Sequence, residues 1–349
     1  MATSLVGSTV LFGQIAVVNN REDLVDLITL LDPYETPFYS MVQKGTALHT
    51  LHEWQTETLQ GTATGGGTTY AEGAAFSAAL INDRTRLTNL VEIFRKDIQV
   101  SNTQRAVRPA GIKDEYLHQV QVAIKEIGRD IEGTLLQGAA GSATGTTGAL
   151  RTMKTLRNFI TTNDFTTSST AVGATGTGFS GTSFAIGEVM FNSVLEQCFL
   201  RGGRVDTVFV NGSSKRQISR FGAGLSGGTA IAQRTINQSE KRLIASVDTY
   251  DSDFGVVNVV LDRWVGTTEG GQFQGTINPD NRAFFLQLDA WEIASLRPLK
   301  HVPLPPGGDA VRGMILTELT LVSYAERWNA NLHGIATKLT PASDGTIQS

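Results

Sequence analysis

Residues 21–60 read REDLVDLITLLDPYETPFYSMVQKGTALHTLHEWQTETLQ, and the interpretation of the whole chain starts from this stretch. Its first part predicts a short amphipathic helix that ends at Pro33. The apolar face of this helix would hold Leu24, Leu27, Ile28 and Leu31. Because helices shorter than about 12 residues are marginal in water, this face needs a further surface to pack on. We interpret the segment as a docking arm.

A second short helix is predicted directly after the first. Thr36 is a suitable N-cap, Pro37 suits the first helical position, and Lys44-Gly45 would end the helix. Its apolar side chains would be Phe38, Met41 and Val42. Full burial of each large apolar side chain is worth roughly 1.5–3 kcal/mol, so the two helices together would dock strongly.

A long excursion follows the arm. Residues 49–59 predict a strand with Trp54 at its centre, and residues 84–101 predict the returning strand. Between them, residues 61–83 are rich in glycine and carry Tyr70 and Phe76. A structureless loop of this length is uncommon in a compact domain unless it is functional or disordered. A loop that packs on another subunit is favoured over a mobile surface loop, because two aromatic side chains would otherwise stay in water.

The clearest helix is predicted over residues 112–137. Its apolar stripe consists of Leu117, Val120, Ile124, Ile127, Ile131 and Leu135. At 1.5 Å per residue it would be roughly 35–40 Å long, so it would act as a spine, and Gly138 would end it. Further elements are predicted at 183–201 (helix), 207–210 (strand), 213–221 (polar helix), and 246–265, 283–304 and 314–324 (strands).

The composition excludes several classes of protein. The net charge of −4 over 349 residues argues against a broad basic surface for nucleic acid. The single cysteine, Cys198, excludes a disulfide framework and fits a reducing cytoplasm. No apolar run approaches the length of about 18 residues that a membrane helix needs, and no basic segment precedes the first apolar residues as in a secretory signal.

Sequence motifs for catalysis are almost absent, and we predict no catalytic residue, no cofactor and no metal site. His49 and His52 lack the further ligands that a metal needs, and alternate positions on a strand explain them better. Gly176–Gly181 matches the dinucleotide pattern G-x-G-x-x-G, but the residues before it make a poor buried strand. Cys198 is expected to be a buried, inert thiol. The basic residues Lys215, Arg216 and Arg220 favour a solvated helix face or an ion pair between subunits over a phosphate site.

Several blocks of the chain resemble one family of tailed-bacteriophage major capsid proteins. The arm contains the family's DP.ETPF pattern as Asp32, Pro33, Glu35, Thr36, Pro37 and Phe38, and the next strand contains HEWQT at 52–56. Further blocks are DTVFVN at 206–211 with Lys215-Arg216, ASLRPLK at 294–300 and ANLHGI at 330–335. In family order they cover roughly residues 20–338, which makes the combination fairly specific although no single block is diagnostic.

The resemblance implies an α+β fold of the Hong-Kong-ninety-seven-type. This phage major capsid fold has an N-terminal arm, an extended β-hairpin loop, a peripheral domain with a long spine helix, and an axial α/β domain. The predicted parts are the arm at 1–48, the extended loop at 49–101, the peripheral domain at 102–169 with its spine helix at 112–137, the axial domain at 170–285, the return to the peripheral domain at 286–340, and a flexible tail at 341–349.

The resemblance also implies a function. The chain is expected to be a structural virion protein without enzymatic activity that self-assembles into the pentamers and hexamers of an icosahedral capsid around double-stranded DNA, bound without sequence specificity. We expect it in the virion capsid, and in the host cytoplasm during assembly. Its expected partners are a separate scaffolding protein, a portal and possible decoration proteins, but no membrane. The predicted subunit-interface residues are Leu27, Pro37, Phe38, His52, Trp54, Tyr70 and Phe76.

Two departures from relatives and three rival interpretations limit this expectation. Only about twenty residues precede the arm, so a fused scaffolding domain is not expected, and residues 61–83 contain no lysine for covalent cross-linking. The nearest rival is an encapsulin-like compartment that encloses a cargo enzyme. A nucleotide-dependent enzyme that uses the 176–181 glycines, and an oligomeric α+β protein of unknown role, are the other two.

Overall fold

The computed structural model describes most of the chain, and the rest of the residues fall outside the description. The described stretches are 33–59, 72–73, 84–107, 111–138, 141–146, 149–166, 186–219, 221, 247–266, 281–306 and 308–335, with backbone alone at 236–237, 242–243, 340–341 and 347–348. Leu27, Tyr70, Phe76, Arg220 and the 176–181 glycines lie outside the described residues.

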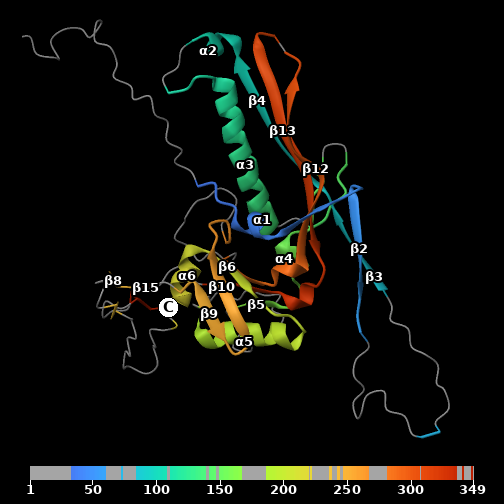
Figure 1. Ribbon diagram of the computed structural model, residues 1–349, viewed down its shortest axis with the longest axis vertical. Coiled ribbons are helices and arrows are strands. Elements are labelled where there is room, and N and C mark those ends of the chain that lie inside the picture. Colours follow the sequence, from blue (N-terminus) through green and yellow to red (C-terminus); the bar gives the residue numbers. More distant parts are fainter. Residues whose placement is uncertain are drawn as a thin grey trace, which may run out of the picture.

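A long sheet forms one half of the body (Figure 1). Its strand order is β1 (Gln43–Thr46), β12 (Trp291–Leu304), β13 (Ala310–Ser323) and β4 (Glu92–Ser101). β13 pairs antiparallel with both β12 and β4, whereas β1 pairs parallel with β12. The predicted strands at 283–304 and 314–324 are therefore confirmed, although the first is interrupted between residues 286 and 291.

Helix α3 (Glu115–Gln137) runs along this sheet beside β4 and is the predicted spine (Figure 1). The Asp114 side chain caps its start by accepting the amides of Tyr116 and Leu117, and Gly138 follows its last residue as predicted. This side-chain cap fixes the beginning three residues later than the sequence pattern suggests, since the orphan amides of the first turn are satisfied there.

Only the second half of the predicted apolar stripe of α3 is fully buried. Ile127, Ile131 and Leu135 are buried, whereas Leu117 is 58% and Ile124 is 42% exposed. Leu117 and Leu135 are 18 residues, or five turns, apart and so share one face. They differ in burial because α1 (Pro37–Met41) and α4 (Leu156–Phe159) lie at the C-terminal end of α3 (Figure 1).

Residues 33–47, which we call the strap, cross the molecule at this end of α3 (Figure 1). The predicted helix after Thr36 is confirmed, but its predicted end at Lys44-Gly45 is wrong. The helix ends at Met41 and Val42 is extended, because residues 43–46 form β1 and take up ladder hydrogen bonds along Glu292–Ser295 of β12.

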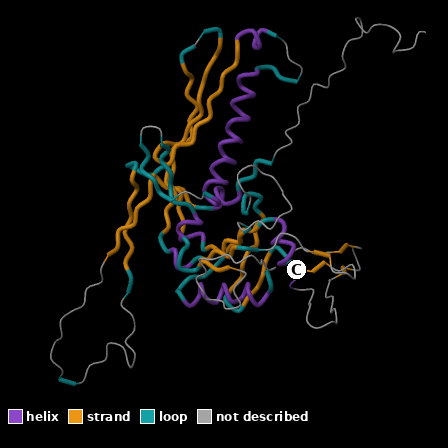
Figure 2. Tube along the Cα trace, turned by 180° about the vertical axis from the view of Figure 1, so that it is seen from behind, coloured by secondary structure: helices purple, strands orange, loops and turns teal. Residues whose placement is uncertain are grey.

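The extended loop begins as a two-stranded hairpin that projects from the body (Figures 1 and 2). β2 (Leu51–Glu57) pairs antiparallel with β3 (Arg84–Leu90) over all seven residues. The predicted returning strand at 84–101 is divided at Val91, after which β4 leaves the hairpin and pairs with β13. Residues 92–101 therefore lie in the long sheet, although the predicted division placed them in the loop.

A second sheet forms the axial half of the body. Its order is β5 (Asp164–Thr166), β14 (Ala330–His333), β11 (Arg282–Leu286), β6 (Thr207–Val210), β10 (Gly255–Leu261) and β9 (Thr249–Ser252). Helices α5 (Glu188–Leu200) and α6 (Gly212–Ile218) flank it, which confirms the helices expected near 183–201 and 213–221. β5 and β14 come from segments assigned to the peripheral part. β14 pairs with β11, β5 pairs with β14 at the edge of the sheet, and their side chains Phe165 and Leu332 pack into its core.

The remaining described elements are short. They are α2 (Asn102–Ala106), the 3-10 helices η2 (Leu288–Ala290) and η3 (Glu326–Trp328), and the strand pairs β7 (Ile236–Asn237) with β8 (Arg242–Leu243) and β15 (Thr340–Pro341) with β16 (Ile347–Gln348).

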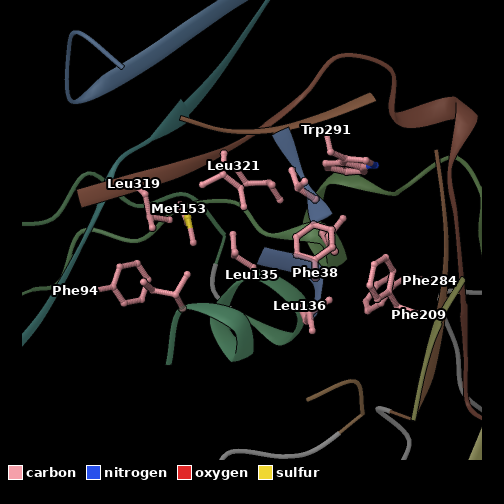
Figure 3. Close-up of a cluster of buried hydrophobic side chains, with 14 of the residues drawn as sticks. Phe38, Phe94, Leu135, Leu136, Met153, Phe209, Phe284, Trp291, Leu319 and Leu321 are labelled. Atoms are coloured by element: carbon pink, nitrogen blue, oxygen red, sulfur yellow. The ribbon is translucent and has the colours of Figure 1, made fainter. Parts of the chain in front are cut away.

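One hydrophobic core joins the two halves at the C-terminal end of α3 (Figure 3). It contains Phe38 from the strap, Leu135 and Leu136 from α3, Leu319 and Leu321 from β13, and Phe209 and Phe284 from the axial sheet. A second core of Phe191, Val194, Leu195 and Cys198 of α5 lies against the axial sheet. Because Phe38 packs in the core that the two halves share, the strap is part of the junction between them.

Candidate assembly elements

The strap is held by the interior of its own chain. Phe38 is fully buried, and its ring meets that of Phe209 on β6 edge to face, with centroids 5.5 Å apart. The surface that covers Phe38 is therefore intramolecular and leaves its side chain no exposed area for a neighbour. Pro37, the other predicted interface residue described in the strap, is half-buried at the first position of α1.

Glu132 of α3 holds the backbone of the strap. Its Oε1 accepts the amide of Phe38 at 2.6 Å, and its Oε2 accepts the amide of Tyr39 at 2.8 Å. These are amides of the first turn of α1, which have no partner within the helix. Burial of the Glu132 carboxyl group, assisted by the nearby Asp262, raises its pKa to about 8.

Further contacts extend along the strap on both sides of α1. The indole Nε1 of Trp264 donates to the carbonyl of Glu35 at 2.9 Å, and Lys125 lies over the ring of Tyr34 at 4.6 Å. At the other end, the amide of Ala47 donates to the carbonyl of Ser295 at 2.9 Å. The strap is therefore fixed to α3, to the long sheet and to the axial half at once.

Trp54 anchors the hairpin to the body. Its side chain is buried, its Nε1 donates to the carbonyl of Ser323 at 2.8 Å, and its ring lies 6.2 Å from that of Phe159. His52 is half-buried two residues earlier on the same face, 6.0 Å from the Trp54 ring. Like Phe38, Trp54 contacts its own subunit, so its role at an interface stays a prediction.

Asn89 and Arg151 hold the point where the hairpin leaves the body. The buried Asn89 side chain donates to the carbonyls of Leu321 at 2.7 Å and Lys154 at 3.1 Å, and accepts the Lys154 amide at 2.8 Å. Arg151 donates to the carbonyl of Val91. Neither residue was predicted from the sequence, since their partners are up to 232 positions away.

A buried carboxylate strengthens the same region. Glu318 of β13 is buried and forms ion pairs with Arg297 of β12 and, at 3.9 Å, with Arg151. Two guanidinium groups thus compensate one buried negative charge, which a buried carboxylate requires. The pairing ties the segment after α3 to the long sheet next to the base of the hairpin.

The outer part of the hairpin is open to solvent. Glu57 pairs with Arg84 at 3.2 Å and Glu53 with Arg86 at 3.4 Å, and all four side chains are exposed. Exposed ion pairs of this kind contribute about 0–1 kcal/mol each, so they do little to stabilise the hairpin alone. Leu59, just beyond β2, is 90% exposed. The described surface of the hairpin therefore offers both apolar and charged groups to a contact.

The described residues offer little for catalysis or cofactor binding. Among them, no three His, Cys, Asp or Glu side chains come together as a metal site. Cys198 is buried as predicted, and burial raises the pKa of its thiol to about 12. Lys215, predicted on a solvated face or in a subunit contact, instead bonds within the chain to Asp248 at 3.0 Å and to the carbonyl of Val259 at 2.7 Å. No helix in the described stretches has the length and apolarity of a membrane span.

Comparison with known proteins decides the family. A family model described as SU10 major capsid protein matches residues 8–336. The chain belongs to the SU10 major capsid protein family. The predicted membership of the phage major capsid proteins is thereby confirmed. A curated relative, the major capsid protein of Escherichia phage Phieco32, is 33% identical over 113 residues, a match that spans 32% of this chain and 32% of the relative.

Solved structures similar to this SU10-family chain agree on the fold. A chain of Mycobacterium phage Adephagia matches with a TM-score of 0.57 and 13% identity, over 96% of this chain and 100% of the other. The holo-SrpI encapsulin complex from Synechococcus elongatus PCC 7942 matches with a TM-score of 0.52 and 9% identity, over 91% and 93% of the two chains. These similarities confirm the predicted Hong-Kong-ninety-seven-type fold, and at such low identity they show the fold alone.

Proposed function

We propose that this chain is the subunit of an icosahedral phage capsid that self-assembles into pentamers and hexamers around double-stranded DNA. The observation that carries the proposal is the match of the SU10 major capsid protein model to residues 8–336, nearly the full chain. The fold adds support, because a body of two sheets and a spine helix bears a projecting hairpin (Figure 1). Such a hairpin gives the subunit an element that reaches beyond its own body to a neighbour at both five-fold and six-fold positions.

The hairpin is the element we place between subunits. Leu51 and Leu59 are exposed on it, and the ion pairs of Arg84 and Arg86 could be exchanged for partners on a neighbour at small cost. Leu117 and Ile124 leave apolar surface on the outer half of α3. Of the residues predicted from the sequence, Leu27, Pro37, His52, Tyr70 and Phe76 stay proposed interface residues, while Phe38 and Trp54 act through the strap and hairpin they anchor.

The proposed partners follow from the capsid role. They are further copies of the chain, enclosed DNA held without sequence specificity, a separate scaffolding protein, a portal and possible decoration proteins. Assembly would take place in the host cytoplasm, and the subunit would have no enzymatic activity. Because residues 61–83 contain no lysine, we expect the shell to be non-covalent. Denaturing electrophoresis of mature particles should give a single monomer band, and a ladder of oligomers would contradict this.

An encapsulin-like compartment is the second candidate, since the chain shares its fold with the holo-SrpI encapsulin complex. The two candidates differ in what they enclose. Co-expression with the neighbouring genes, followed by electron microscopy and analysis of the contents, separates them. Shells that package DNA support the capsid proposal, shells filled with one protein cargo and lacking a DNA entry point support the compartment, and a small defined oligomer under the same conditions would contradict both.

A further inference from the structure

Two carboxyl groups meet at the junction between the halves of the molecule. Glu132 comes from α3, and Asp262 comes directly after β10 of the axial sheet; both are fully buried. The amide of Asp262 donates to the carbonyl of Val210 at 2.8 Å, and its Oδ1 accepts the amide of Trp264 at 2.9 Å. Asp262 is therefore held by the axial half, while Glu132 holds the strap through the amides of Phe38 and Tyr39.

The second carboxyl oxygen of Asp262, Oδ2, indicates how Asp262 and Glu132 interact. Oδ2 is buried and has no hydrogen-bond donor among the described residues. The side chains of Asp262 and Glu132 nevertheless lie within hydrogen-bonding contact of each other. Two ionised carboxylates are both acceptors only, so this contact becomes a hydrogen bond only when one carboxyl group is protonated. A single proton on Glu132 would supply the missing donor.

The charged groups around the pair do not replace this proton. On α3, Arg129 pairs with Asp130 and lies over the Trp264 ring at 5.9 Å; next to Asp262, Arg263 pairs with Glu35 of the strap at 3.7 Å. Lys44 lies over the ring of the neighbouring Tyr39, at 3.4 Å from its centroid, and donates to the Tyr39 carbonyl. Within the described stretches no ion pair links any of these cations to Glu132 or Asp262, although the charge of Lys44 attracts that of an ionised Glu132. The negative charge of Glu35 adds to that of Asp262.

We propose that Glu132 and Asp262 form a proton-operated latch, which holds the strap at the junction while they share a proton and releases it when that proton is lost. The latch is a property of the single subunit and goes beyond the proposed capsid function. It acts on the strap, which contacts both halves of the body, so its release would loosen the strap and the junction together.

The direction of the pH dependence follows from the pKa values. Burial raises the pKa of Glu132 from 4.5 to about 8 and also raises that of Asp262. Between about pH 4.5 and pH 8 the folded state thus binds more protons than the unfolded state, so the stabilisation is greatest in acid and is lost as pH rises to about 8. Partial burial lowers the pKa of Lys44 from 10.5 to about 8. Its contribution has the opposite sign, since stability then rises with pH above 8.

Hydrogen exchange of the full chain tests the latch. Peptides over residues 33–47 are followed by mass spectrometry from pH 6 to pH 9, with rates corrected for the intrinsic pH dependence of exchange. In the wild type, the protection of the Phe38 and Tyr39 amides should fall about tenfold or more over this range. In Glu132→Gln, the new nitrogen can donate to Asp262 but cannot accept a strap amide, so protection should be lower than in the wild type at pH 6 and should show no further fall up to pH 9. The matched control is Glu126→Gln, an exposed carboxylate on the same helix paired with Lys96.

A second variant keeps the test decisive if Glu132→Gln fails to fold. In Asp262→Asn the side-chain amide donates to an ionised Glu132, so protection of the strap should again be independent of pH. Glu126→Gln should keep the wild-type fall. Unchanged wild-type protection between pH 6 and pH 9 would overturn the latch, and so would a folded Glu132→Gln or Asp262→Asn variant that retains the wild-type fall. None of these outcomes depends on whether the chain forms shells.

Discussion

The indole Nε1 of Trp54 donates a 2.8 Å hydrogen bond to the carbonyl oxygen of Ser323, 269 residues further along the chain. This bond joins the hairpin to the end of β13, the central strand that pairs with both β12 and β4. The hairpin therefore leaves the body from a fixed point, and its direction is set before any neighbour is met.

Substitution of Trp54 should measure the strength of this attachment. Trp54→Phe keeps most of the packing against Phe159 but leaves the Ser323 carbonyl without its donor, at a cost of about 1–3 kcal/mol. Trp54→Ala should cost about 3–5 kcal/mol. Urea denaturation checks both values, with the exposed Leu59→Ala as control, expected within about 0.5 kcal/mol of the wild type. Equal stability of Trp54→Ala and wild type would show that the hairpin is not anchored here.

Asn89 should be a second anchor of comparable strength. Asn89→Ala removes both donors and the acceptor that bind the backbone groups of Leu321 and Lys154. We expect a loss of about 3 kcal/mol in unfolding free energy and faster proteolysis in the hairpin. The control is Asn102→Ala, whose exposed side chain bonds only to the side chain of Asp309 among the described residues. Proteolysis at the wild-type rate would count against Asn89 as an anchor.

Gly313 should tolerate even the smallest side chain poorly. A Cβ at this position of β13 would collide with the Tyr116 hydroxyl and with Nε2 of His301, which are hydrogen-bonded to each other at 2.9 Å. Gly313→Ala should therefore destabilise the chain by about 1–3 kcal/mol. The double variant with Tyr116→Phe should recover part of this loss, because the clashing oxygen is gone. Thermal or urea denaturation of the two single variants and the double variant measures these changes in stability.

Gly133 supplies the matched comparison. It lies inside α3, where a Cβ would meet no atom within 4 Å apart from its chain neighbours and the backbone of its own helix, so Gly133→Ala should stabilise the chain by up to about 1 kcal/mol. If Gly313→Ala were as stable as Gly133→Ala, the close packing of Tyr116 and His301 on β13 would be refuted.

Cys198 should be unreactive in the folded chain. Burial raises the pKa of its thiol to about 12, so almost no thiolate, the reactive form, is present at pH 8. An aromatic disulfide reagent should titrate no thiol in native protein and one per chain in guanidinium chloride, since Cys198 is the only cysteine. Rapid reaction in the native state would place Cys198 at the surface.

Long periodic segments were predictable from the sequence because local physics determines them. The stripe of α3, the strand at 207–210 and the hairpin strand around Trp54 lie where the pattern indicates. Their ends were less predictable. α1 ends four residues early because β12, about 250 positions away, offers residues 43–46 a place in the sheet. Val91 divides the returning strand because its two halves have different partners.

The anchors of the candidate site could not be predicted in the same way. Glu132 meets Asp262, and Asn89 meets Leu321, only after both halves have packed. One signal was present: Glu132 interrupts the apolar end of the spine between Ile131 and Leu135. A charged residue in such a position indicates a buried partner, but the sequence does not say which one.

Assembly of this subunit into an icosahedral capsid is best tested by a cryo-electron microscopy reconstruction of particles formed by co-expression with the neighbouring genes. We expect closed icosahedral shells in which one fold occupies both pentamers and hexamers, with the hairpin beyond residues 57 and 84 lying against a neighbouring subunit. Particles without pentamers and hexamers, or shells in which that hairpin contacts only its own chain, would contradict it.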